Sequence, residues 1–173
     1  SKRVIAWISN SKLTYEDSNQ KYKEKFNSII QKQINHLINE IKRSEWIDDK
    51  MIGCAAIILT GLSYQDKSRY LDFGLNLLNK IIKFSFDNEG FPKSRSIKQL
   101  NFYLKYFILI REWLKESQND IPEYIDETIY YLGQAYSLIC QNIKKNILFN
   151  GNHETNNSGF DNYLTRLGYK FKN

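Results

Sequence analysis

The chain has 173 residues, which is enough for one domain with a substantial core and too few to make two domains the expectation. Hydrophobic residues at 42% and charged residues at 25% are typical of a globular protein and exclude wholesale disorder. The net charge of +6 favours anionic partners, but no zinc-finger, basic-zipper or aromatic RNP motif is present, so no nucleic-acid partner is predicted.

Helices are predicted throughout the first third of the chain. After a short helix-like stretch at residues 3–8, residues 19–43 repeat apolar side chains at three- and four-residue steps, which predicts an amphipathic outer helix. Residues 48–62 are apolar on all sides and rich in small residues, as expected for a buried helix. Asp48 and Asp49 stand at its start, where negative charge favours the helix dipole. Its apolar run is too short to cross a bilayer, so no transmembrane segment is predicted.

The remaining pattern predicts three long helices followed by a tail. These helices span residues 66–85, 97–116 and 121–144. Asp66 and Ser96 are expected to cap the first two, and the third begins beside a favourable first-turn proline, Pro122. Gly and Pro in residues 87–92 end the first of them. Residues 145–173 are polar and rich in Gly and Asn, which predicts a loop-like tail with one short helix near residues 160–167.

The order of these helices indicates the fold class. Outer amphipathic helices alternate with buried ones across short turns, which is the pattern of antiparallel helix hairpins. Because no repeat of fixed length is present, a partial (α/α) toroid is preferred to a solenoid. Residues 1–173 are therefore predicted to form a single all-α helical domain. Because the chain begins within a helix-like stretch and without Met, we interpret it as a fragment of a longer protein.

Few residues are candidates for catalysis or metal binding. His36 and His153 lie far apart, so they are interpreted as a helix-edge residue and a loop residue, and neither a metal site nor a cofactor is predicted. Cys54 and Cys140 lie in apolar runs and are expected to be small buried hydrophobes, although the sequence leaves a disulfide open.

A basic loop at residues 88–96 is the strongest candidate for a binding site. It brings Lys93 and Arg95 beside Ser96 at the start of a helix, where free amides and basic side chains can hold an anion. The alternative is a capping turn with incidental surface charge. Asp48 and Asp49 could be paired acids, but neighbouring helix residues point about 100° apart, so helix-start acids are the default interpretation.

Six stretches of the chain, taken in order, resemble one known family. They are RVIAWI at 3–8, AIILTGL at 56–62, NEGFPKSRS at 88–96, LIREWL at 109–114, IPEY at 121–124 and LFNG at 148–151. Together they resemble the helical domain of heparinase II/III-type polysaccharide lyases and cover nearly the whole chain.

This resemblance implies an incomplete α/α toroid whose concave face lines a groove for acidic, uronate-containing polysaccharide. It also implies a location in the periplasm or cell envelope and a following β-sandwich domain, which is absent from this chain. In such lyases the substrate carboxylate is neutralised, a Tyr or His base removes the neighbouring proton, and an acid protonates the departing glycosidic oxygen.

The chain departs from the family pattern at two places. Asp48 and Asp49 stand where many members have Asn-His, and residues 97–99 lack the tyrosine that often follows the basic turn. No catalytic residue is therefore assigned, and the isolated chain is predicted to be inactive. The predicted substrate-binding residues are Asp48, Asp49, Lys93, Arg95, Ser96, Lys98 and Asn150. A rival interpretation is a non-catalytic helical-hairpin scaffold that binds a protein partner through an exposed apolar patch.

Overall fold

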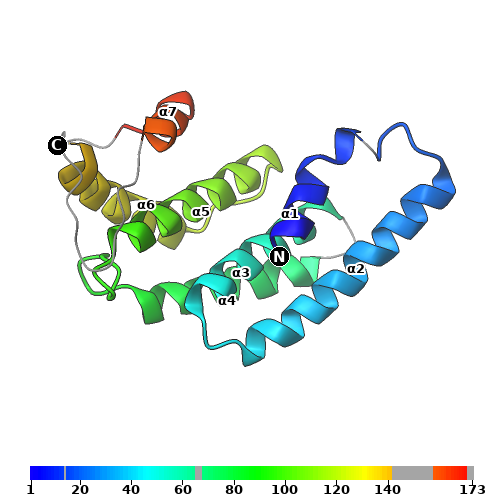
Figure 1. The fold of residues 1–173 in the computed structure, drawn as a ribbon, viewed down its shortest axis with the longest axis horizontal. Helices are drawn as coiled ribbons and strands as arrows, with labels where there is room; N and C mark the ends of the chain where they lie inside the picture. Colours follow the sequence, from blue (N-terminus) through cyan, green and yellow to red (C-terminus); the bar gives the residue numbers. More distant parts are fainter. Residues whose placement is uncertain (14, 65–67, 142–157, 171–173) are drawn as a thin grey trace. The chain divides into compact units, whose positions relative to one another are not determined.

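The computed structural model describes residues 1–13, 15–64, 68–141 and 158–170 (Figure 1). Within these ranges the protein is all-α, as predicted, and its only β structure is an isolated bridge between Phe86 and Pro92. The elements in chain order are α1 (Lys2–Ser9), η1 (Ser11–Leu13), α2 (Gln20–Arg43), α3 (Ile47–Ser63), α4 (Ser68–Ser85), α5 (Ile97–Glu116), α6 (Glu123–Tyr136), the π-helical turn η3 (Ser137–Gln141) and α7 (Ser158–Arg166).

The observed bounds follow the sequence signals closely. The bounds of α5 agree with the prediction, and α3 extends one residue beyond the predicted helix at each end. Asn19 caps α2, since its side chain accepts a hydrogen bond from the Tyr22 amide at 2.9 Å. The short helix predicted in the tail is confirmed by α7. The predicted cap at Asp66 lies outside the described residues. Within them, the helix predicted for residues 121–144 is α-helical only from Glu123 to Tyr136, followed by a π-helical turn to Gln141.

The contacts divide the chain into two compact units. The first contains Ser1–Ile81 and Glu112–Asp120, and the second contains Ile82–Arg111 and Ile121–Asn173. The boundary therefore crosses α4 and α5. The single domain and the toroid stay predictions.

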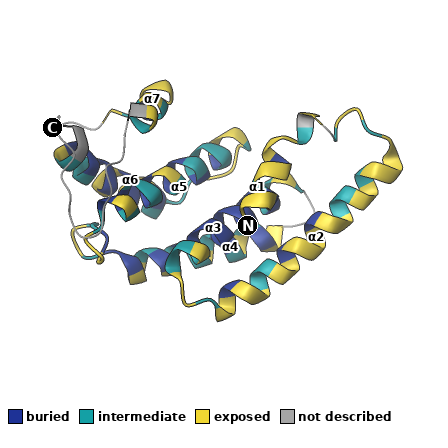
Figure 2. Ribbon diagram, viewed as in Figure 1, coloured by how far each residue is buried: buried dark blue, intermediate teal, exposed yellow. Residues whose placement is uncertain are grey.

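The core of the first unit is built around α3. Every residue of α3 from 51 to 60 is buried, whereas α2 exposes a long outer face (Figure 2). Both α1 and α2 contribute isoleucines to the cluster that packs on α3, including Ile8, Ile30 and Ile34. Small residues allow this close packing, because a Cβ at Gly61 would lie 2.5 Å from the Leu71 backbone nitrogen on α4.

In the first unit, Cys54 behaves as the predicted small hydrophobe. It is fully buried and free of any disulfide, and its thiol donates to the Gly74 carbonyl oxygen at 3.1 Å. Burial raises the pKa of the Cys54 thiol far above its ordinary value, because the thiolate would lose its hydration. The side chain of Cys140 lies outside the described residues.

The Cys54 thiol is therefore expected to be unreactive in the folded protein. In a Cys140→Ser background, a chromogenic disulfide reagent should modify Cys54 only as fast as the unit opens, because the reactive species is an exposed thiolate. Full reactivity should return in denaturant. Immediate modification under native conditions would contradict the burial of this side chain.

The second unit is held together by aromatic and polar contacts between its helices. The Phe86 ring packs edge-on against Tyr103 of α5 at 4.9 Å between centroids. Arg111 of α5 donates to Asp126 of α6 at 2.6 Å. The Tyr136 hydroxyl, at the end of α6, is 2.6 Å from Asp161 of α7. These contacts fix α5, α6 and α7 as one group.

Candidate functional site

The basic loop between α4 and α5 is organised by one carboxylate, Asp87. Its Oδ1 atom accepts hydrogen bonds from the amides of Glu89 at 3.0 Å and Phe91 at 2.9 Å. The Asp87 amide in turn donates to the Phe91 carbonyl oxygen at 3.0 Å. Gly90 completes this turn with a φ of 75°, a conformation that glycine adopts without steric cost.

Arg95 is bound to the same carboxylate. One of its guanidinium nitrogens lies 2.9 Å from Asp87 Oδ2, and its guanidinium also lies 5.3 Å from the Phe91 ring centre. Asp87 Oδ2 accepts no hydrogen bond from the described residues, so the contact is an ion pair. A bound anion would therefore share Arg95 with a carboxylate that is already in place, which lowers the electrostatic gain from this arginine.

Other predicted residues of the loop surround the start of α5. Ser96 caps this helix as predicted, with its hydroxyl oxygen 3.4 Å from the Gln99 amide nitrogen. Lys93 is exposed, and its ammonium group donates to the Lys83 carbonyl oxygen at 3.4 Å. Lys98 is exposed in the first turn of α5. Lys93, Arg95, Ser96 and Lys98 are thus brought together in one loop and helix start.

A pocket of about 340 Å³ adjoins this loop on the side of α6. Tyr131 forms part of its wall, and Gly90 approaches so closely that an added Cβ would lie 2.5 Å from the Tyr131 Cβ. The residues that line the pocket are Ile82, Lys83, Phe86, Asp87, Asn88, Gly90, Tyr124, Glu127, Thr128 and Tyr131. Two tyrosines beside amide, ammonium and carboxylate groups form a surface that can stack on a sugar ring and hydrogen-bond its hydroxyls.

The other predicted site residues lie elsewhere. Asp48 and Asp49 belong to the first unit and occupy the first turn of α3, which agrees with their interpretation as helix-start acids. Asn150 and His153 lie outside the described residues. His36 is exposed on α2, as expected of a helix-edge residue. In the described ranges, no group of three or more His, Cys, Asp or Glu side chains is arranged to hold a metal ion.

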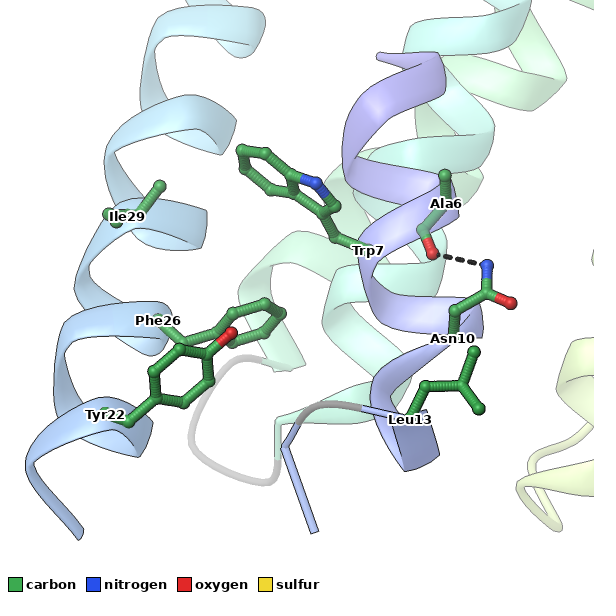
Figure 3. A pocket seen from close by; sticks show the side chains of 7 residues that line it. All are labelled: Ala6, Trp7, Asn10, Leu13, Tyr22, Phe26 and Ile29. Atoms are coloured by element: carbon green, nitrogen blue, oxygen red, sulfur yellow. Dashed lines mark hydrogen bonds between the residues drawn. The ribbon is translucent and has the colours of Figure 1, made fainter. Parts of the chain in front are cut away.

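A second pocket, between α1 and α2 of the first unit, was not predicted from the sequence (Figure 3). Its volume is about 360 Å³, and Trp7 projects from α1 toward α2 while Tyr22 and Phe26 project from α2 toward α1. Its lining residues are Ala6, Trp7, Asn10, Leu13, Tyr22, Phe26 and Ile29. The spacing of Trp7, Tyr22 and Phe26 in the sequence contained no signal that would have brought them to one pocket.

A smaller pocket of about 210 Å³ shares Phe26 with this one and contains a polar network. The Tyr64 hydroxyl donates to Asn27 Oδ1 at 3.0 Å, and the Asn27 side-chain amide donates to the Tyr15 hydroxyl at 3.0 Å. Desolvation, with a smaller contribution from Tyr15, raises the pKa of Tyr64 to about 12.

This shift predicts a loss of stability in alkali. The folded protein holds the Tyr64 proton more tightly than the unfolded chain, whose tyrosine pKa is about 10. The stabilisation of the fold by protonated Tyr64 is therefore complete below about pH 10. It should be lost as the pH rises from there toward about 12. Denaturant midpoints measured across this range should fall less steeply for Tyr64→Phe than for the unmodified protein. Parallel curves would contradict the assignment to Tyr64.

Comparison of the chain with protein-family models, curated proteins and solved structures finds no match. No helix within the described part of the chain combines the length and the apolar character needed to cross a bilayer.

Proposed function

We propose that this chain is the helical domain of a heparinase II/III-like protein and binds an acidic, uronate-containing polysaccharide. Its helices would form part of an (α/α) toroid. Three observations support the proposal, namely the all-α architecture of the described residues, the six sequence stretches that resemble the family in order, and the net charge of +6.

The main support is the cationic loop beside the tyrosine-lined pocket in the second unit. Lys93 and Lys98 are exposed basic residues whose positive charge attracts uronate carboxylates, and the Tyr131 ring, with the residue 42% exposed, offers a face for a sugar ring. Arg95 contributes less in this arrangement, because Asp87 already neutralises its charge. The proposed binding residues are therefore Lys93, Lys98 and Tyr131.

The proposed reaction of the complete protein is β-elimination, to which this chain would contribute binding. The residues at 48–49 and 97–99 do not supply the Asn-His and Tyr of the family pattern, so no proton transfer is assigned to this chain. We propose that a β-sandwich partner domain supplies the remaining groups and that the chain alone does not cleave the polysaccharide. Formation of an unsaturated uronic product, followed by its ultraviolet absorbance, would contradict this part of the proposal.

Replacing Tyr131 by alanine is expected to weaken polyuronate binding by about tenfold, which corresponds to about 1.4 kcal/mol of stacking and burial. The variant keeps the Cβ against which Gly90 packs, so the loop should keep its conformation. Calorimetric titration with a soluble polyuronate measures the change.

Tyr22→Ala is the matched control, since Tyr22 is also 42% exposed but lies on α2 in the first unit. Binding should stay within about twofold of the unmodified protein in this control. Equal losses in both variants, or no binding of polyuronate by the unmodified protein, would refute the proposed site.

A further inference from the structure

The pocket between α1 and α2 has the composition of a protein-docking site. Of its lining residues, Trp7 is 36% exposed, Leu13 80%, Tyr22 42% and Ile29 38%. Its one strongly polar side chain, Asn10, donates its amide to the Ala6 carbonyl oxygen at 2.7 Å within the same helix. The pocket therefore offers apolar area and few groups that a polar ligand could use, which favours large apolar side chains as its occupants.

Positive charge lies on the walls of this pocket and of the smaller one that shares Phe26. The Arg3 guanidinium lies 5.9 Å from the centre of the Trp7 ring, and the Lys23 ammonium group lies 5.5 Å from the centre of the Tyr15 ring. Residues 1–43, which include both helices, contain nine Lys or Arg and four Asp or Glu, so this segment has a net charge of +5. The pocket together with Arg3 and Lys23 at its rim forms the α1–α2 groove. A ligand in this groove would bind more tightly with apolar side chains toward the pocket and carboxylates toward the rim.

We propose that the α1–α2 groove binds an acidic amphipathic helix of a partner protein. A helix satisfies its own backbone hydrogen bonds, and the described part of the first unit has no strand edge that could pair with an extended peptide. Apolar residues at helical spacing would enter between Trp7, Tyr22 and Ile29, and acidic residues would pair with Arg3 and Lys23. This inference concerns the first unit and does not depend on the proposed glycan site in the second.

A designed peptide tests the proposal on the full chain. The probe is a fluorescein-labelled helix of about 20 residues, with Leu and Phe at positions i, i+3, i+4 and i+7 and glutamates on the other face. Fluorescence anisotropy should show saturable binding with a Kd on the order of 10 µM that weakens as salt is added. The same peptide with lysines in place of the glutamates should not bind. Equal binding of both peptides, or no saturation by the acidic one up to about 1 mM, would overturn the proposal.

The exposed residue Leu13 provides a variant that should not disturb folding. Leu13→Ser should weaken binding of the acidic peptide at least about tenfold, and Lys23→Glu should weaken it as much by reversing a rim charge. Leu138→Ser is the matched control, because Leu138 is also exposed, at 69%, but lies on η3 in the second unit. Unfolding curves establish that each variant is folded. Equal effects of the two leucine variants would overturn the proposal.

A binding experiment with anionic vesicles distinguishes a protein helix from a membrane surface as the partner of the groove, because a membrane surface also combines apolar and acidic groups. The probe is a mixture of phosphatidylcholine and phosphatidylserine, with binding measured by co-sedimentation. If vesicles bind through the same groove, with binding lost in Leu13→Ser, and the peptide does not compete, the partner is a membrane and the proposal is wrong. Absence of groove-dependent vesicle binding, together with peptide binding, supports it.

Discussion

Replacing Gly61 by alanine is expected to destabilise the first unit by about 1–3 kcal/mol. A Cβ at this position would lie 2.5 Å from the Leu71 backbone nitrogen and 2.9 Å from its Cα. Backbone atoms cannot rotate away as a side chain can, so α3 and α4 would have to separate. That cost exceeds the gain of up to about 1 kcal/mol that alanine brings to a helix interior. Thermal unfolding should report a loss of several degrees.

Two other glycines supply controls for this experiment. Gly53→Ala should cost less, because the added Cβ would meet the flexible end of the Ile41 side chain. Gly159→Ala on α7 should be neutral or slightly stabilising, since no neighbouring heavy atom lies within 4 Å of the added Cβ. Equal stabilities of the Gly61→Ala and Gly159→Ala variants would contradict the close packing of α3 against α4 at Gly61.

Replacing Asp87 by alanine is expected to destabilise the second unit by about 1–3 kcal/mol and to release the basic loop. The change removes the acceptor of the Glu89 and Phe91 amides and the ion-pair partner of Arg95. Since the Phe91 amide lies in a half-buried residue, its lost partner is only partly replaced by water. Hydrogen exchange at the Phe91 amide should accelerate together with the fall in unfolding free energy.

Asp87→Asn separates the hydrogen bonds from the charge. The asparagine carbonyl oxygen can still accept from both amides, so the stability loss should stay below that of Asp87→Ala. The same variant releases the Arg95 guanidinium from its carboxylate, so polyuronate binding is expected to strengthen severalfold. A stability loss equal to that of Asp87→Ala, or weaker polyuronate binding, would show that the charge pair itself maintains the loop.

The local elements of this protein followed from the sequence alone. Apolar spacing predicted the bounds of α2 and α5, and the cap residue Ser96 was visible because N-capping depends on neighbouring backbone amides. The small residues around Gly53 predicted a helix buried on several sides, which α3 is. Short-range hydrogen bonding and amphipathicity determine these features, so a single sequence contains them.

The pairing of side chains beyond the reach of one helical turn was decided only by the folded structure. Arg95 looked available for an anion, but folding of the loop brings it to Asp87, eight residues earlier, and neutralises it. Trp7 and Phe26 each belonged to a predicted helical stretch, and nothing in those two stretches fixed how far apart α1 and α2 would lie at their surface. Ion pairing and pockets depend on distances between segments that sequence spacing does not encode, and this is why the groove between α1 and α2 emerged only with the fold.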